Sequence, residues 1–283
     1  MKRTRSRWPL AIGAAVLLAG GATAAMWWPR GDAPDPVSPD ADVQEALPVP
    51  PYPPRLVEDE QYDKCMSMIA DDPEGAEAIA SSWQATGGGA AATHCQALAA
   101  IATGEPESGA RMLEDLAHGG KLDGMMRAVL LSQAAEARLM AEQAADALRD
   151  STEALSIAPD DPDLLIGRAN ALDSLDRSKD ALEDLNRALE RDPARGDALV
   201  LRASIWRQMD RLDDAGADID KAVSLDPDDA EALLERGILR QRKGDLEGAR
   251  QDWTRARDID PNSEAAEQAA QNLTLLNSGP IRK

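Results

Sequence analysis

The sequence predicts an all-α protein built from a repeated helical unit. Its most regular feature is a set of prolines spaced 34 residues apart, Pro159, Pro193, Pro227 and Pro261. A fixed period of this length is typical of a unit made of two helices and a turn. No stretch alternates between apolar and polar residues for long enough to indicate a β-sheet. The 283-residue chain has no Phe and is rich in alanine, which suits closely packed helices.

Small and branched residues keep the same register as the prolines. An alanine stands five residues before each proline, another alanine twelve residues before it, and a leucine 28 residues before it. Small residues let two antiparallel helices approach closely, and the leucine fills the groove between them. Proline lacks an N–H and restricts the preceding residue, so it ends the second helix of the unit. The alanine nearest each proline is Ala154, Ala188, Ala222 or Ala256, and the farther one is Ala147, Ala181, Ala215 or Ala249.

With these columns, residues 128–261 resemble four tetratricopeptide (TPR) repeats, at about 128–161, 162–195, 196–229 and 230–263. The resemblance implies a right-handed helical solenoid, because a single hairpin cannot bury its apolar face alone. The last segment, 262–283, is then a capping helix with a short tail.

The resemblance also implies where a partner binds. The first helix of each TPR hairpin normally lines the concave face, which suits an amphipathic helix or an extended peptide. Some TPR proteins hold a terminal carboxylate with basic and amide side chains at these positions, but here only Asn170 and Arg207 are similar donors. The expected groove residues are Ser132, Glu136, Ile166, Asn170, Asp173, Val200, Ser204, Arg207, Leu234, Ile238 and Gln241.

The N-terminus predicts a membrane anchor. A basic tail, 1–7, precedes an uncharged stretch of 21 residues, 8–28, which is long enough to cross a bilayer core of about 30 Å. Tryptophans stand at both ends of the stretch, and the basic tail should stay in the cytoplasm. The alternative is a cleaved signal peptide, because Ala22-Thr23-Ala24 fits a cleavage site. Either interpretation exports the rest of the chain.

Two further segments separate this span from the repeats. Residues 29–57 contain nine prolines and should form an extended tether at about 3 Å per residue. Residues 58–127 form a divergent helical region, in which 89–122 is expected to be a degenerate TPR-like hairpin.

The divergent region holds the only two cysteines, Cys65 and Cys95. In an exported compartment an even number of cysteines indicates a disulfide. Together with His94 and His118, the only histidines, they could also bind zinc. Their spacing lacks the paired arrangement of a zinc site, so a structural disulfide is favoured.

Two charged columns also repeat. Arg168, Arg202 and Arg236 form one column, and Asp150, Asp184, Asp218 and Asp252 form the other. Such columns are typical of arginines paired with carboxylates between packed helices. The pairs could form within a repeat or with the next repeat. Alternatively, the arginines could bind an acidic partner.

Composition and the absence of catalytic motifs restrict the classes of function that the sequence allows. No nucleophile elbow, phosphate loop, metalloprotease motif or dinucleotide fingerprint occurs in a fitting context, so neither catalysis nor a cofactor is expected. The first 30 residues hold five of the 31 basic residues and none of the 51 acids. The remainder therefore has 26 bases and 51 acids, a net charge of −25, which repels nucleic acid and favours a basic partner.

The whole arrangement resembles bacterial envelope-assembly proteins. We therefore expect a single-pass inner-membrane protein with a periplasmic TPR domain that serves as a protein–protein interaction scaffold. One alternative is an accessory factor of cytochrome c maturation that holds apocytochromes. An alternative of another class is an enzyme with its site in residues 58–127.

Overall fold

The computed structural model of the protein describes residues 56–119 and 122–278. Within these ranges it consists of thirteen α-helices and contains no strand, which confirms the predicted all-α solenoid. No helix in the described ranges is long and apolar enough to span a membrane. The predicted basic tail (1–7), membrane anchor (8–28) and nearly all of the tether (29–57) lie outside them.

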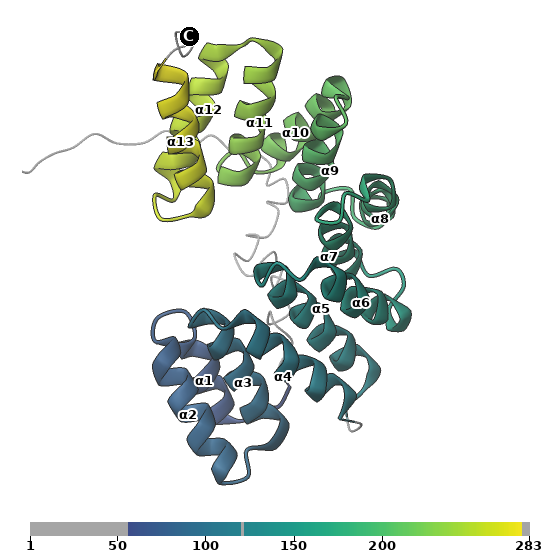
Figure 1. Ribbon diagram of the computed structural model, residues 1–283, viewed down its shortest axis with the longest axis vertical. Helices are drawn as coiled ribbons and strands as arrows, with labels where there is room; N and C mark the ends of the chain where they lie inside the picture. Colours follow the sequence, from purple (N-terminus) through teal and green to yellow (C-terminus); the bar gives the residue numbers. More distant parts are fainter. Residues whose placement is uncertain (1–55, 120–121, 279–283) are drawn as a thin grey trace, which may run out of the picture. The chain divides into compact units, whose positions relative to one another are not determined.

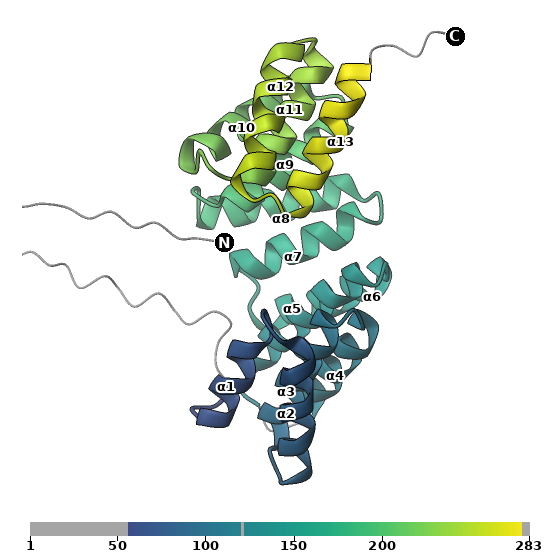
Figure 2. The same ribbon diagram turned by 90° about the vertical axis from the view of Figure 1, so that its left-hand side faces the viewer.

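The helices follow one another as antiparallel hairpins (Figures 1 and 2). Residues 58–127 hold the first four helices, and α5 begins at Gly124, ahead of the predicted repeat start at 128. The odd-numbered helices from α5 to α13 adjoin each other along one face. The helices are α1 (Glu60–Met68), α2 (Pro73–Ala85), α3 (Gly89–Ala102), α4 (Pro106–His118), α5 (Gly124–Met140), α6 (Ala144–Ile157), α7 (Pro162–Asp173), α8 (Ser178–Arg191), α9 (Gly196–Gln208), α10 (Leu212–Leu225), α11 (Ala230–Lys243), α12 (Leu246–Ile259) and α13 (Glu264–Ser278).

Recurring residues set the helix ends. Helices α6, α8, α10 and α12 each end two residues before a proline of the 34-residue column. Aspartates then cap several of the following helices; for example, the Asp161 carboxylate accepts hydrogen bonds from the Asp163 and Leu164 amides, at 2.9 and 3.2 Å. The turn inside each hairpin needs a left-handed residue, and these residues also stand 34 apart: Glu142, Asp176, Asp210 and Gly244, with φ of 58°, 57°, 60° and 87°. Only the last is glycine, the residue that adopts this conformation without strain.

The alanine columns form the seams between helices. All eight alanines of the two columns are fully buried, and so are the leucines of the leucine column. A further column of small residues, Ala135, Ala169 and Ala203, ends in Gly237, which lies against Trp253. A Cβ at Gly237 would lie 2.4 Å from Trp253 Nε1, so glycine makes room for the buried indole. The indole N–H donates to the Leu234 carbonyl at 3.2 Å.

The charged columns pair within each repeat. Arg202 donates to both oxygens of Asp218 at 2.7 Å, and the same two-point contact joins Arg168 to Asp184 and Arg236 to Asp252. The pairing resolves the alternative between contacts within and between repeats. These arginines are thereby engaged in the fold and do not form a free surface for an acidic partner.

Asp150 is the column member left without its own arginine. The corresponding arginine position, 16 residues earlier, is Ala134. Arg149 pairs with Asp150 Oδ1 at 2.9 Å, while Arg138 Nε stays 3.8 Å from Oδ2. The buried Oδ2 accepts no hydrogen bond within the described residues, and burial raises the pKa of Asp150 despite Arg149.

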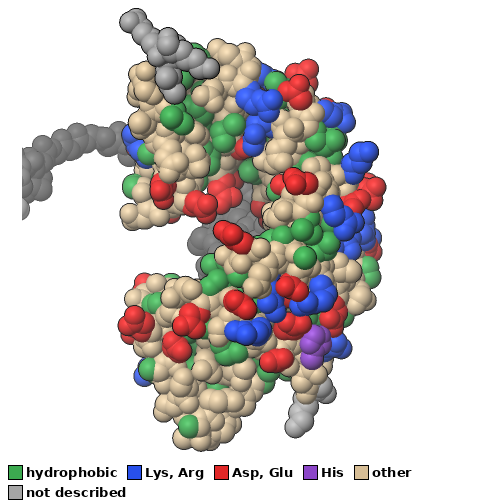
Figure 3. All heavy atoms as spheres, viewed as in Figure 1, with side chains coloured by type: hydrophobic (Ala, Val, Ile, Leu, Met, Phe, Trp, Pro, Cys, Tyr) green, Lys and Arg blue, Asp and Glu red, His purple; other side chains and the backbone are tan. Residues whose placement is uncertain are grey.

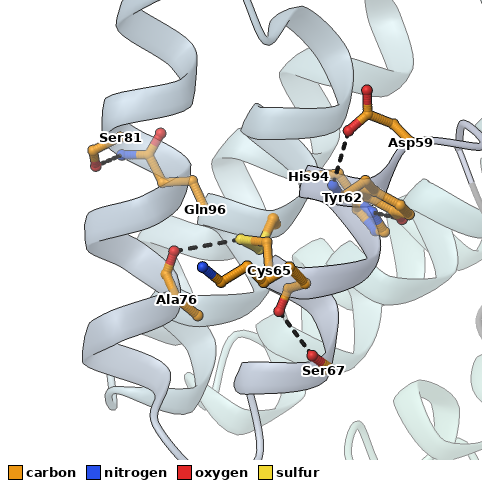
Figure 4. Close-up of a disulfide and its surroundings, with 10 residues drawn as sticks. Asp59, Tyr62, Cys65, Ser67, Ala76, Ser81, His94 and Gln96 are labelled. Carbon is orange, nitrogen blue, oxygen red and sulfur yellow. Dashed lines mark hydrogen bonds between the residues drawn. A yellow bond between two sulfur atoms is a disulfide. The ribbon is translucent and has the colours of Figure 1, made fainter.

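A disulfide joins α1 to α3 in the divergent region (Figure 4). It links Cys65 to Cys95, whose Cα atoms lie 6.2 Å apart. The buried His94 beside it receives a hydrogen bond from the Tyr62 hydroxyl at Nδ1, 2.7 Å, and donates from Nε2 to Gln133 Oε1, 2.8 Å. Because an amide oxygen only accepts, Nε2 carries the hydrogen in this contact, and burial, which lowers the pKa of His94, favours the neutral ring that accepts from Tyr62 at Nδ1. His118 lies elsewhere, against Glu153, and no metal-binding group of three or more side chains occurs in the described ranges.

Candidate protein-binding groove

The odd-numbered helices α5, α7, α9, α11 and α13 enclose an open cavity of about 550 Å³, which we call the groove. On α5, α7, α9 and α11 the leucine column is buried in the core, and other residues of these helices line the groove. The partly exposed Leu139, Val200 and Leu234 give the groove an apolar floor. Acidic side chains gather along this hollowed side of the molecule (Figure 3). The groove therefore combines an aliphatic floor with a negatively charged rim.

The structure brings together about half of the residues expected from the TPR resemblance. Asn170 is exposed at the groove, whereas Ile166 is buried beneath it. Those that line the groove are Glu136, Ile166, Asn170, Val200, Ser204 and Leu234. Those that do not line it are Ser132, Asp173, Arg207, Ile238 and Gln241.

Arg207 is not the free donor to a ligand that the TPR resemblance implies. Its guanidinium pairs with the buried carboxylate of Glu235, at 2.5 and 3.2 Å, and also donates to Ser204 Oγ at 3.1 Å. Burial raises the pKa of Glu235, and Arg207 acts in the opposite direction. Arg207 is thus a partner of a buried acid rather than a free donor that would orient a ligand.

A column of carboxylates in the groove was not predicted from the sequence. Asp163, Asp197 and Glu231 stand 34 residues apart, four residues after the first three turn prolines, and all three line the groove. Acids in the first turn of a helix usually complement its dipole. Because that role is common, the same acids give no separate signal that they also line a groove. The signal was present in the sequence as a further repeating column.

Arg195 bridges the first two members of this column. It reaches Asp163 at 2.6 Å with one terminal nitrogen and Asp197 at 2.6 Å with the other. Partial burial would raise the pKa of Asp197, but hydrogen bonds from Arg195 and the Ala198 amide outweigh it and hold that pKa below its usual value. Arg195 therefore offsets one of the two negative charges in this part of the rim, and Asp163 and Asp197 together still carry one.

Three glutamates of the rim have no such compensation. Glu136, Glu231 and Glu264 form no hydrogen bond or ion pair through their carboxylates within the described residues. The pKa of Glu136 is raised by desolvation in the groove and by the nearby Asp163. The pKa of Glu231 is raised by desolvation and by repulsion from Asp229, Glu264 and Asp197. The rim thus carries negative charge that no cation of the described chain offsets.

Comparison with known proteins agrees with the repeat assignment. The tetratricopeptide repeat family model matches residues 166–230 and 206–264, so this part of the chain consists of TPR repeats. Among the curated proteins, none matched the sequence.

Solved structures share the fold. A thermophilic TPR protein of Thermus thermophilus superimposes with a TM-score of 0.56 at 16% identity, covering 64% of this chain and 97% of that one. In the Cut9–Hcn1 hetero-tetramer of the APC/C the TM-score is 0.60 at 13% identity; the match covers 75% of this chain but only 42% of that one. MamA of Desulfovibrio magneticus RS-1, residues 41 to the end, gives 0.50 at 21% identity, covering 62% and 97%. At these identities the likeness extends to the fold alone.

Proposed function

We propose that this protein is an interaction scaffold whose groove holds a peptide or helix of a partner protein. The observation that carries the proposal is the groove itself, because the first helices of four hairpins and the final helix α13 line an open cavity with an apolar floor and a polar rim. Apolar cavities with a few fixed polar groups are the usual form of a binding site. TPR-type solenoids are suited to this use, since stacking of hairpins produces an extended concave surface. The net charge of −25 outside the first 30 residues favours a partner with basic character.

The proposal extends to the cell envelope. Residues 8–28 would anchor the protein in the inner membrane with a cytoplasmic N-terminus, and residues 29–57 would hold the helical domain in the periplasm. The basic tail and the apolar span support this placement. The Cys65–Cys95 disulfide is also in keeping with an oxidising compartment. Protease added to spheroplasts should digest the helical domain, and protection of the whole domain would contradict this orientation.

Photo-crosslinking in cells tests the groove directly. A photoreactive amino acid placed at Asn170, which is exposed in the groove, should form a defined adduct that mass spectrometry can identify. The matched control is the same amino acid at Glu190, which is exposed on α8 outside the groove. Adducts at Asn170 and none at Glu190 support the proposal. The absence of an adduct at Asn170, or equal adducts at both positions, contradicts it.

A further inference from the structure

We propose that one end of the groove, between α9, α11 and α13, binds the side chain of an arginine or lysine in the partner segment. This acidic subsite consists of Asp197, Glu231 and Glu264. The inference rests on the proposed function of the groove and narrows it, because it assigns the attraction for a basic partner to three carboxylates rather than to the net charge of the whole domain.

The repeat itself shows how a cation fits this column of acids. Between Asp163 and Asp197, the chain supplies Arg195, which contacts both carboxylates at 2.6 Å. One repeat later, between Asp197 and Glu231, the residue equivalent to Arg195 is Asp229. Asp229 caps α11 by accepting hydrogen bonds from the Glu231 and Ala232 amides, at 2.9 and 3.0 Å. The second interval of the column therefore has an additional acid where the first has its own arginine, and no basic side chain among residues 56–119 and 122–278 pairs with Glu231.

The helix dipole explains only part of this arrangement. Glu231 and Glu264 both lie in the first turn of their helices, where an acid gains about 0.3 to 1 kcal/mol. The interaction with the dipole explains why each glutamate stands at the start of its own helix. It does not explain why three carboxylates surround one cavity. Desolvation, together with repulsion from Asp229, Glu264 and Asp197, raises the pKa of Glu231. A bound guanidinium or ammonium group would relieve both the repulsion and the lack of partners.

The floor beside the acidic subsite decides what kind of cation fits. Val200, Leu234 and Ala265 line the same cavity as the three carboxylates. Lysine and arginine lay their aliphatic stems on apolar surface while the charged group reaches the rim. The occupant is therefore a basic side chain within a segment that also carries aliphatic residues.

A designed peptide tests the acidic subsite. The probe is a fluorescein-labelled peptide with the core Leu-Arg-Leu between Ala, Gly and Ser residues, and its twin carries citrulline, the neutral isostere of arginine. Fluorescence anisotropy with the purified full chain should show that the arginine peptide binds about tenfold more tightly than its twin, as one charge-assisted contact predicts. The double variant Glu231→Gln/Glu264→Gln should bind both peptides equally.

A matched variant separates the acidic subsite from diffuse attraction. Glu107→Gln/Glu190→Gln removes the same charge from two exposed glutamates outside the groove and should keep the tenfold preference. Thermal unfolding followed by circular dichroism verifies that both double variants fold. An equal loss of preference in the two double variants overturns the inference, and so does equal binding of both peptides by the unaltered chain.

The same measurements distinguish failure of this inference from failure of the proposed function. If the arginine peptide and its twin bind equally and both suppress crosslinking at Asn170, the groove binds peptides without a cation subsite. If neither peptide binds and Asn170 forms no adduct in cells, both the acidic subsite and the proposed function are wrong.

Discussion

Arg202 and Asp218 show how charged side chains are accommodated between the two helices of a hairpin. Asp218 is 8% exposed, and its carboxylate receives two hydrogen bonds of 2.7 Å from one guanidinium. The stem of the arginine covers apolar surface, while its third nitrogen donates to Asn186 on α8. Burial of such a pair is costly, so its contribution to stability depends on both partners being present.

The first prediction concerns this pair. Replacing Arg202 by Met leaves the Asp218 carboxylate buried without its partner and should lower the free energy of unfolding by about 3 kcal/mol or more. The double variant Arg202→Met/Asp218→Leu should recover most of that loss, because apolar groups then replace both charges. Urea unfolding of the two variants measures the difference. A double variant as unstable as Arg202→Met would show that packing, rather than charge pairing, causes the loss.

The second prediction concerns pH and His94. Burial lowers the pKa of His94 from its ordinary value, and the hydrogen bond to Gln133 opposes this only in part. Because the unfolded chain binds the proton more readily, stability contributed by neutral His94 is present above its ordinary pKa of about 6.5 and is lost as pH falls below it. Replacement by Gln should reduce the fall in melting temperature between pH 7 and pH 5. An identical fall in His94→Gln and in the unaltered protein would contradict this assignment.

At the scale of the helices, the sequence predicts the features that depend on residues repeated in every hairpin with the same physical role. The columns of alanine, leucine and proline locate the hairpins because burial and the missing proline N–H act in the same way in every repeat. The left-handed turn residues could not be predicted, because Glu142, Asp176 and Asp210 carry no glycine signal and are held in that conformation by the adjoining helices. The acid column of the groove was hidden for another reason, since first-turn acids are common in helices that bind nothing.

The third prediction concerns α1, whose attachment depends on few contacts. This nine-residue helix is tied to α3 through the Cys65–Cys95 disulfide and the contact between Tyr62 and His94 (Figure 4). The disulfide closes a loop with a sequence separation of 30, and loss of the link should cost about 3 to 4 kcal/mol. Cys65→Ser, Cys95→Ser and the double variant should all lose the same stability, and hydrogen exchange should accelerate first in α1. Two reactive thiols in protein isolated under non-reducing, denaturing conditions would show that the bridge does not form.

At the scale of the whole described domain, each hairpin is stabilised mainly by its neighbours. The buried residues of successive hairpins form one continuous hydrophobic cluster that runs from α3 to α13. In such a solenoid, stability is approximately a sum of terms for each repeat and each interface between adjacent repeats. Damage to one seam should therefore weaken the hairpins on both sides of it and leave distant hairpins unchanged. This locality distinguishes a solenoid from a globular domain with a single central core.

The fourth prediction uses Ala222, a fully buried alanine of the column nearest the prolines, on α10. Replacing it by Leu adds volume to a seam with no space and should cost about 1 to 3 kcal/mol or more. Hydrogen exchange followed by mass spectrometry should show lost protection in α9 to α12, while α2 to α4 stay as protected as in the unaltered protein. The control is Ser224→Ala, an exposed change on the same helix, which should alter stability by no more than about 0.5 kcal/mol.

If Ala222→Leu leaves the melting curve unchanged, the assigned register of the alanine column is wrong. If it lowers protection equally from α2 to α13, the domain unfolds as one cooperative unit, and the coupling between hairpins is much stronger than a nearest-neighbour solenoid allows.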